Sequence, residues 1–304
     1  MFSKFVLSAA AIAIAGCAPA AAPEATSSLP NARAQGAALV QACEGREGWS
    51  DPAPPARIHG NTYYVGTCGI AALLVTTPDG HALIDGATNE AAPAIIANIR
   101  ALGFDPRDVR VIVGTHEHHD HMGGFSALKA ATGARLLVSE GARRAVETGE
   151  VDPADPQFGT LENMIPVPVD GIVRDGQPVP VGESGFVLNP LATRGHTDGG
   201  TSWTWQSCEK DECLNFAYVD SLSAVSRDGY RLTDHPERVA PFRTTFARVE
   251  AMPCDILITP HPSASNVFAR LSGIVPLRDP AACTTLAEAM RLRLDTRLAQ
   301  EAAE

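Results

Sequence analysis

The sequence predicts an α/β protein in which two mixed β-sheets pack face to face and helices cover both outer faces, a four-layer αβ/βα sandwich. Two observations carry this prediction. Short runs rich in β-branched and aromatic residues alternate with segments of helical apolar spacing in the first half, and the second half repeats this plan. The chain also has the size and composition for a large core, since 45% of its 304 residues are hydrophobic and only 19% are charged.

Turn residues separate the elements expected in the first half. Asp79-Gly80 is a hairpin turn between two strands, and Gly103 is placed to end a helix. A loop over residues 151–158, with two Pro and two Asp, is expected to overhang whatever site the strands build. The expected strands cover residues 62–65, 71–76, 81–84, 111–113 and 135–138, and the expected helices cover residues 91–102, 125–131 and a short stretch from 142.

The second half has the same alternation. A polar turn at residues 209–212 joins two of its strands. Its expected strands cover residues 167–173, 177–181, 186–191, 201–206, 214–219 and 256–259, and its helices cover residues 236–252 and, as a C-terminal amphipathic helix, 280–300.

The N-terminal segment has the features of an export signal. Lys4 precedes an apolar run over residues 5–15 that is too short to span a bilayer as a mature helix. The run ends in Ile14-Ala15-Gly16-Cys17, which resembles a bacterial lipobox. This resemblance implies a signal peptide over residues 1–16 and a mature chain that begins with a lipidated Cys17.

The location and domain plan follow from this leader. A lipidated Cys17 implies a periplasmic protein tethered to the outer membrane, whereas ordinary cleavage near Ala20 or Ala22 would free it into the periplasm. Residues 17–36, rich in Ala, Pro and Ser, are interpreted as a flexible tether. Residues 37–304 are then expected to form a single domain.

The cysteines agree with export. If Cys17 is lipidated, six of the seven cysteines remain. An oxidising compartment would favour their pairing as disulfides. Cys208 and Cys213 flank a polar turn, so a local bridge is the simplest pairing. Cys43–Cys68 and Cys254–Cys283 would complete the set, although six cysteines allow about 15 connectivities and the sequence does not choose among them.

The charge argues against one class of partner. The formal net charge is −11 and the pI is near 5.3. Binding to nucleic acid needs a basic face, and the sequence has no Lys/Arg cluster that would supply one. We therefore expect no nucleic-acid partner.

The stretch Thr115–Gly124 concentrates metal-binding side chains. It contains His116, His118, Asp120 and His121 directly after a buried strand. Alternate side chains of an extended segment face the same way, which places His116 beside His118 and turns Glu117 elsewhere. Asp120 and His121 are expected in the turn that follows. Imidazole nitrogens and a carboxylate oxygen suit zinc, so the stretch predicts a site for neighbouring divalent metals.

Two later histidines complete a pattern. Gly195-His196 follows a strand in the second half, and His261 lies between two prolines after the strand at 256–259. Together with the first cluster, their order and spacing resemble the metallo-β-lactamase superfamily over nearly all of the mature chain, which implies the four-layer fold of that superfamily. The resemblance implies a first zinc held by His116, His118 and His196 and a second zinc held by Asp120, His121 and His261.

Within the superfamily the chain is similar to β-lactamases of subclass B3. The ligand set contains no Cys, and Asp220-Ser221-Leu222-Ser223 has Ser where other subclasses place a metal-binding Cys. The pair Cys254 and Cys283 resembles the disulfide common in this subclass. The resemblance also implies that Ser221, Ser223 and Gln157 contact the substrate.

This resemblance implies a zinc-dependent β-lactamase that confers antibiotic resistance. Two Zn²⁺ ions per chain would activate a shared hydroxide, which Asp120 orients towards the lactam carbonyl of a penicillin, cephalosporin or carbapenem. We expect a small-molecule β-lactam as the partner and a monomeric chain. Asp85 and Thr115 are candidates to orient the histidine ligands. The remaining histidines, His59, His81, His119 and His235, are expected to lie outside the metal shell.

Two other functions stay open at the level of the sequence. Another hydrolase of the same fold, such as a lactonase or a thioester hydrolase, would use a metal-bridging Asp, and Asp220 is close to that position. A non-enzymatic metal-binding lipoprotein is the second alternative. Three protein ligands per metal favour catalysis, because they leave coordination positions open.

Overall fold

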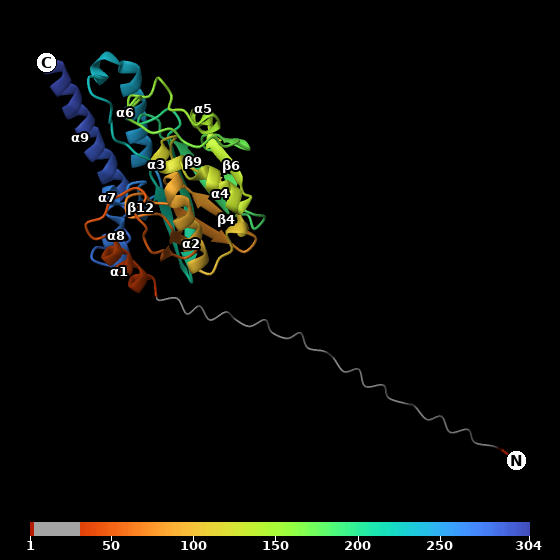
Figure 1. The fold of residues 1–304 in the computed structure, drawn as a ribbon. Helices are drawn as coiled ribbons and strands as arrows, with labels where there is room; N and C mark the ends of the chain where they lie inside the picture. Colours follow the sequence, from red (N-terminus) through yellow and green to blue (C-terminus); the bar gives the residue numbers. More distant parts are fainter. Residues whose placement is uncertain (3–30) are drawn as a thin grey trace.

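The computed structural model describes Met1, Phe2 and residues 31–304 (Figure 1). Most of the predicted signal peptide, the lipobox with Cys17 and most of the predicted tether lie outside the described residues. Within the described part of the chain, no helix combines the length and the apolar composition needed to cross a membrane.

The first sheet has seven strands in sequence order, β1 to β7. Its first four strands pair antiparallel, and the strands from β4 onwards pair parallel. The Asp79-Gly80 turn joins β3 to β4, with Thr77 opposite Gly80, as the sequence predicts. The strands are β1 (Ala56–His59), β2 (Thr62–Tyr64), β3 (Leu73–Thr77), β4 (Gly80–Ile84), β5 (Val109–Val113), β6 (Arg135–Ser139) and β7 (Gly171–Val173).

The second sheet has five strands in the order β12-β11-β10-β9-β8. All its neighbours pair antiparallel except β11 and β12, which are parallel. The strands are β8 (Val179–Pro180), β9 (Val187–Ala192), β10 (Thr201–Glu209), β11 (Glu212–Tyr218) and β12 (Ile256–Ile258).

Three hydrophobic clusters define four layers. The middle cluster joins the inner faces of both sheets, with Tyr64 and Ile84 from the first and Trp203 and Phe216 from the second. The Trp203 indole N–H also donates to the Gly114 carbonyl at 3.0 Å, which links β10 to the end of β5. The two outer clusters pack α2 (Ala92–Ala101), α4 (Phe125–Thr132) and α5 (Glu140–Thr148) on the first sheet and α6 (Pro236–Glu250) and α9 (Ala282–Ala303) on the second.

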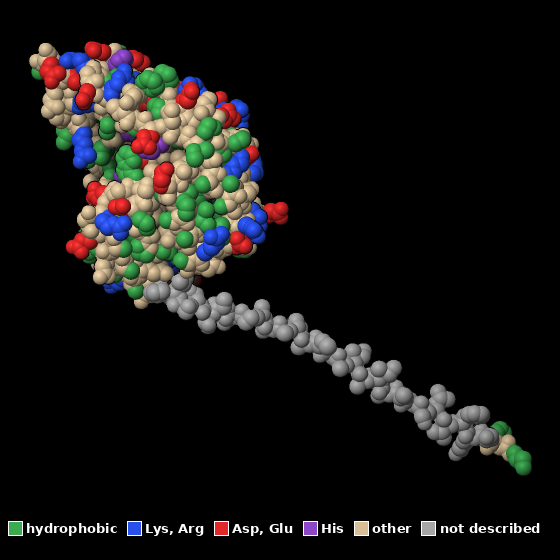
Figure 2. Space-filling model, viewed as in Figure 1, with side chains coloured by type: hydrophobic (Ala, Val, Ile, Leu, Met, Phe, Trp, Pro, Cys, Tyr) green, Lys and Arg blue, Asp and Glu red, His purple; other side chains and the backbone are tan. Residues whose placement is uncertain are grey.

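The predicted four-layer sandwich is therefore confirmed. Figure 1 shows α6 and α9 on one side of the sheets and α2, α4 and α5 on the other. On the face drawn in Figure 2, acidic and basic side chains are interspersed, so charge of either sign is spread over this face. Burial of both sheets between helices explains why their strands are short apolar runs with few charges.

The helix α1 (Ala32–Cys43) corrects the predicted tether, which was expected to extend to residue 36. Asn31 caps this helix by accepting from the Ala34 amide. The helix packs on α8 (Val267–Ser272) so closely that a Cβ at Gly36 would lie 2.2 Å from the Leu271 carbonyl oxygen. Its Ala-rich composition is shared with the preceding segment, so composition did not reveal the helix, which is held by α8, by the Cys43–Cys68 bridge and by the contact of Gln35 with the Arg57 amide.

Two predicted strands are shorter than expected. The run at 167–173 is extended in the sheet only over β7, and the run at 177–181 only over the two residues of β8. Pro168 explains the first difference, because proline has no N–H to donate to a neighbouring strand. Val167 instead packs as irregular chain against the outer cluster of the first sheet.

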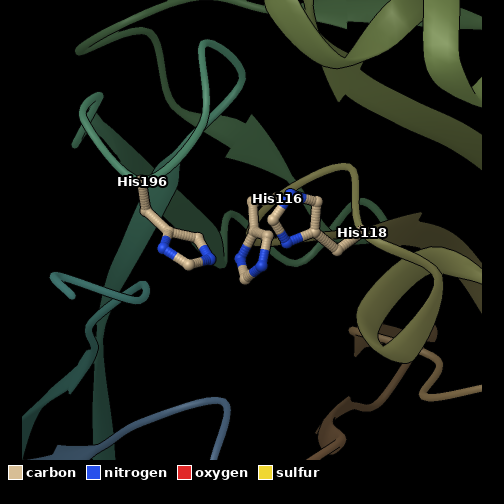
Figure 3. Close-up of side chains that lie close together, drawn as sticks. All are labelled: His116, His118 and His196. Carbon is tan, nitrogen blue, oxygen red and sulfur yellow. The ribbon is translucent and has the colours of Figure 1, made fainter. Parts of the chain in front are cut away.

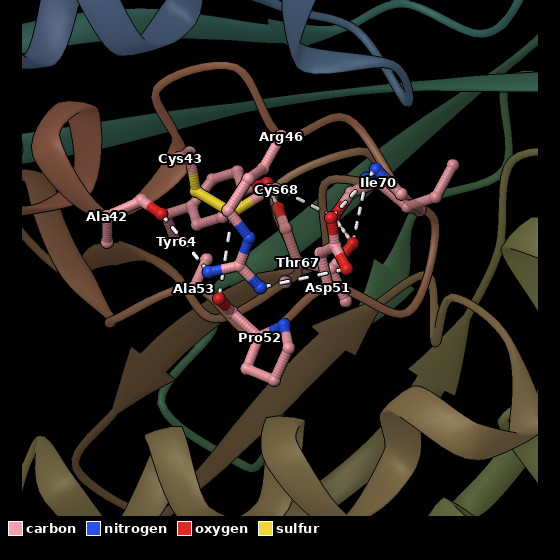
Figure 4. Close-up of a disulfide and its surroundings, with 12 residues drawn as sticks. Ala42, Cys43, Arg46, Asp51, Pro52, Ala53, Tyr64, Thr67, Cys68 and Ile70 are labelled. Atoms are coloured by element: carbon pink, nitrogen blue, oxygen red, sulfur yellow. Dashed lines mark hydrogen bonds and ion pairs between the residues drawn. A yellow bond between two sulfur atoms is a disulfide. The ribbon is translucent and has the colours of Figure 1, made fainter.

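The three expected disulfides are present in the structure. Cys43–Cys68 ties the end of α1 to the segment between β2 and β3, and near this bridge Arg46 pairs with Asp51 in the segment that follows α1 (Figure 4). Cys208–Cys213 closes the β10–β11 hairpin, and Cys254–Cys283 ties the residues before β12 to the start of α9. Each bridge restricts the unfolded chain and so stabilises the fold.

Candidate metal centre

The first part of the site follows the end of β5. Residues 115–118 are an irregular segment with bends in which His118 itself is extended, and the rings of His116 and His118 lie close together with centroids 4.7 Å apart, as the sequence predicts. The one-turn helix α3 (His119–Met122) then carries Asp120 and His121, so these two residues lie in a helix and not in a simple turn. The His121 amide donates to the His118 carbonyl, which folds the helix back towards the extended segment.

Two further segments bring His196 and His261 to the same place. His196 follows β9, and the centroid of its ring lies 4.7 Å from that of His116. The preceding Gly195 has a positive φ of 144°, and a Cβ there would lie 2.6 Å from the Phe242 ring, so the turn requires glycine. His261 lies directly before α7 (Pro262–Ser265), and its ring centroid is 5.1 Å from that of His121.

The six predicted ligands form two groups in space. In each group one potential ligand atom per residue lies within 4.8 Å of the others, and the groups are His116, His118 and His196, here called the first triad, and Asp120, His121 and His261, here called the second triad. Figure 3 shows the three rings of the first triad pointing into one space from different segments. The three segments thus meet where β5, β9 and β12 end.

Buried nitrogen atoms without partners test whether these residues fit a metal. The Nε2 atom of His116 and both ring nitrogens of His121 are buried and have no hydrogen-bond partner among the described residues. A buried polar atom without a partner costs about 1–3 kcal/mol. A metal ion would offset this cost, and the set of imidazole nitrogens and one carboxylate oxygen suits zinc. The residues therefore fit a zinc centre.

In each first-triad histidine one ring nitrogen, here called the outer nitrogen, points away from the other ligands and has a hydrogen-bond partner from another part of the chain. These bonds leave the Nε2 atoms of His116 and His196 and the Nδ1 atom of His118 free to bind a metal. Such bonds fix the tautomer and the direction of a ligating ring. The pairs are His116 Nδ1 with Asp220 Oδ1 at 2.7 Å, His118 Nε2 with Asp155 Oδ2 at 2.9 Å, and His196 Nδ1 with the Ser223 carbonyl at 2.8 Å.

Asp85 is the corresponding group beside the second triad, but it is held less directly. Its Oδ2 atom lies 3.9 Å from His121 Nδ1. The same carboxylate accepts from the Tyr218 hydroxyl at 2.7 Å and from the Thr115 amide and hydroxyl at 2.7 and 2.9 Å. Thr115 therefore contacts Asp85 and not a histidine. Burial raises the pKa of Asp85 to about 6.

Glu117 links two of the ligand segments, a role that the sequence analysis missed. Its buried carboxylate accepts from the Thr197 hydroxyl at 2.8 Å and from the Gly199 amide at 2.9 Å. It points away from the His116 and His118 rings, as the alternation predicts, and towards the segment that carries His196. The only sign of this role in the sequence was the position of the charged Glu117 between two metal ligands.

Burial sets the ionisation of the ligands. It lowers the pKa of His196 to about 3 and that of His261 to about 4, and it lowers that of His116 well below its ordinary value. These rings are therefore neutral at neutral pH, which is the form that binds metals. Burial alone would raise the pKa of Asp120, but the neighbouring His121 more than offsets this and holds that pKa below its ordinary value.

The three predicted substrate contacts lie next to the partners of the first triad. Ser221 follows Asp220, and Ser223 supplies the carbonyl that His196 contacts. Gln157 lies two residues after Asp155, whose other carboxylate oxygen accepts from the Gln157 amide at 2.7 Å. The side-chain nitrogen of Gln157 is buried without a partner among the described residues, so it is free to donate to a ligand.

Trp49 lines the side of the site next to the second triad, a position that the sequence did not predict. It precedes β1, and its side chain remains 41% exposed. The ring centroid of Trp49 lies 5.3 Å from that of His119 and 6.2 Å from that of His261. His119 therefore lies against Trp49, outside both triads. The other histidines lie elsewhere, with His59 near Glu209, His81 against Phe104 and His235 stacked on Tyr230.

Comparison with protein families gives a consistent assignment. The sequence model of the metallo-β-lactamase superfamily matches residues 65–209. Two curated relatives match short segments only. They are an N-acyl homoserine lactonase of Rhizobium johnstonii, 33% identical, and a hydroxyacylglutathione hydrolase of a Polaromonas species, 38% identical. The matches cover 19% and 18% of this chain and 31% and 23% of the length of those proteins.

Solved structures match over almost their whole length. The metallo-β-lactamase MIM-1 of Novosphingobium pentaromativorans is 49% identical with a TM-score of 0.85, over 88% of this chain and 98% of that one. The metallo-β-lactamase SMB-1 is 44% identical with a TM-score of 0.79, over 84% and 99%. BJP-1 of Bradyrhizobium japonicum, a subclass B3 metallo-β-lactamase, is 32% identical with a TM-score of 0.76, over 84% and 97%.

Proposed function

The chain belongs to the metallo-β-lactamase superfamily and to its subclass B3, and on this premise we propose that it is a zinc-dependent β-lactamase. The observation that carries the proposal is the convergence of the two triads, with their buried, unpartnered nitrogens. We propose that Ser221, Ser223 and Gln157, which lie next to residues that contact the first triad, form a substrate rim beside them. A metal-binding protein without catalytic function would have no need of such a rim.

The two triads would hold two zinc ions. Three protein ligands each leave open coordination positions, which a catalytic metal requires. Bound zinc supplies Lewis acidity, which lowers the pKa of a coordinated water from about 15.7 to about 7 and polarises a carbonyl group. The first triad comes from two different segments of the chain, and its rings are fixed by outer hydrogen bonds.

The side chains of the site have separate tasks in hydrolysis of the lactam C–N bond. Asp120, whose pKa is held below its ordinary value, stays ionised and accepts a hydrogen bond that orients the attacking water. The hydroxyls of Ser221 and Ser223 bind the substrate carboxylate, and the free amide N–H of Gln157 donates to a substrate oxygen. Trp49 packs against the apolar part of the substrate.

The cellular setting is part of the proposal. Three disulfides favour an oxidising compartment, which agrees with a periplasmic protein exported by a signal peptide over residues 1–16. We propose that Cys17 carries a lipid anchor and that the enzyme acts as a monomer on β-lactams that enter the periplasm. Its activity there would confer resistance to these antibiotics.

One assay tests the function. Zinc-loaded protein is incubated with a carbapenem, a penicillin, a cephalosporin and an acyl homoserine lactone, with and without a chelator. We expect β-lactam hydrolysis that the chelator abolishes.

The lactone is included because a lactonase is among the relatives that match a segment of this chain. In this structure Asp220 contacts the outer nitrogen of His116 at 2.7 Å, on the side of the ring away from the other ligands. A metal-bridging role for Asp220 would require a different position, which favours the β-lactamase. Hydrolysis of the lactone alone would overturn the proposal, and inertness towards all four compounds would favour a metal-binding protein.

A further inference from the structure

A loop without regular structure carries the two substrate serines. We call residues 221–230 the serine loop. A single arginine of the C-terminal helix donates hydrogen bonds to several acceptor atoms of this loop. Arg297 on α9 donates to the Ala224 carbonyl, to the Ser226 hydroxyl at 2.7 Å and to the Tyr230 carbonyl at 2.9 Å. One guanidinium group thus fixes the loop at three positions.

Arg297 is itself held in place before it reaches the loop. Its Nε atom donates to the Glu301 carboxylate at 2.6 Å, one helical turn further along α9. Glu301 also accepts from the Thr233 amide at 2.8 Å, which ties the residues after the serine loop to the same helix. Both side chains are mostly buried, 25% and 11% exposed, so their pairing is weakly screened by solvent.

The serine loop in turn holds the overhanging loop, residues 151–158. The backbone N–H of Arg227 donates to the Pro156 carbonyl at 2.9 Å. The Arg227 side chain donates to the carbonyls of Asp155 and Pro156 at 3.2 and 3.3 Å, while it lies over the Tyr230 ring. Every contact of this second clamp uses backbone carbonyls, so it sets the path of the overhanging loop.

The overhanging loop contacts the metal centre through Asp155. Asp155 accepts from the outer nitrogen of His118 at 2.9 Å and from the backbone N–H of Gln157 at 2.7 Å. A series of contacts therefore runs from Arg297 through the serine loop and Arg227 to a first-triad histidine and to the backbone of Gln157, whose side chain is a predicted substrate contact. Small displacements of such groups cost reaction rate and binding, because the productive geometry is narrow.

We propose that Arg297 is a positioning residue for the substrate rim: by clamping the serine loop, and through it the overhanging loop, it sets how tightly the substrate binds. The proposal rests on the proposed β-lactamase function. Arg297 touches neither the metal ligands nor the substrate, so its effect is on binding geometry more than on the chemical step.

The test compares three zinc-loaded, full-length variants with the wild type. Arg297→Ala removes the clamp, and Arg297→Lys keeps the charge and part of the hydrogen bonding. Arg293→Ala is the matched control, because Arg293 is an exposed arginine of the same helix that contacts Met290 within that helix. The measurements are KM and kcat for a carbapenem and hydrogen–deuterium exchange of peptides over the two loops.

We expect Arg297→Ala to raise KM by about tenfold with kcat within about threefold, the pattern of lost binding that is equal in ground and transition states. Exchange should quicken in both loops and stay unchanged in β5 and β12. Arg297→Lys should recover part of the KM, and Arg293→Ala should match the wild type. A lower melting temperature with unchanged KM and unchanged loop exchange would overturn the proposal, because Arg297 would then serve the stability of the fold alone.

A milder variant covers the case in which Arg297→Ala does not fold. Arg227→Gln removes the two guanidinium hydrogen bonds between the loops and leaves the backbone bond from Arg227 to Pro156 in place. We expect faster exchange in the overhanging loop with a raised KM; unchanged values would contradict the proposal. If the wild type hydrolyses no β-lactam, the proposed function fails, while loop exchange in Arg297→Ala still decides whether Arg297 positions the rim.

Discussion

The first triad is buried on every side, whereas the His261 side chain of the second triad is 38% exposed. The outer nitrogens of the first triad are each bonded within 2.9 Å to a partner from a different part of the chain. The outer nitrogen of His121, Nδ1, by contrast lacks a hydrogen-bond partner among the described residues and lies 3.9 Å from Asp85, while its Nε2 atom lies 3.1 Å from Asp120 of the same triad. The first triad is preorganised, and the second depends more on the metal itself for its order.

This difference indicates a division of labour. A metal bound between fixed rings loses little by ordering its ligands, so we expect the first triad to hold zinc more tightly. The second triad opens towards Trp49 and solvent, which is where a substrate can approach. The predictions below test this division, beginning with the largest expected effect.

Removal of the carboxylate ligand should break the second triad alone. We expect Asp120→Ala to lower kcat by more than about 100-fold, because loss of an outer partner of a ligand already costs about 10–100-fold. The variant should bind one zinc instead of two and keep the circular dichroism spectrum of the wild type. Wild-type turnover in this variant would mean that the second triad takes no part in catalysis.

Removal of an outer partner should separate the two triads. Asp220→Asn replaces the carboxyl group that contacts His116 Nδ1 with an amide, and we expect the affinity for the more tightly bound zinc to fall about 10–100-fold. Asp85→Asn is the matched change beside the second triad, where the longer contact predicts a smaller loss. Competition with a chromophoric chelator measures both affinities, and melting curves control for the fold. Equal losses in the two variants would contradict the difference between the triads.

The sequence was informative where local pattern decides structure. Alternation placed His116 and His118 together and turned Glu117 away, and the apolar runs located most strands of both sheets. These features depend on the period of the chain, so a short window of residues contains them.

The missed features depend on contacts between distant segments. Helix α1 resembles the preceding Ala-rich segment and is distinguished by its packing on α8. Asp155 reaches His118 from a loop whose carbonyls contact Arg227 and Arg238, and Trp49 reaches His261 from a segment more than 200 residues earlier in the chain. The residues next to these segments in the sequence do not indicate which distant segment each of them contacts.

The two triads should release zinc at different rates. On addition of excess chelator we expect two phases of zinc loss that differ at least about tenfold in rate, since a single outer partner contributes that much to affinity. The faster phase should come from the exposed second triad. Asp120→Ala provides the control, because it should lack the fast phase and retain the slow one. A single phase in the wild type, or a fast phase in the variant, would show that the triads release zinc alike.

The smallest expected effect concerns the open side of the second triad. Trp49 contributes exposed aromatic surface beside His261 without touching any first-triad residue. We expect Trp49→Ala to raise KM for β-lactams by about two- to tenfold, which corresponds to about 0.5–1.5 kcal/mol for one aromatic contact. Trp49→Phe keeps a ring in place and should recover most of this loss. Because the metal ligands are untouched, zinc content and the rates of the two release phases should match the wild type; an altered slow phase would mean that the two triads are coupled through Trp49, against the division proposed here.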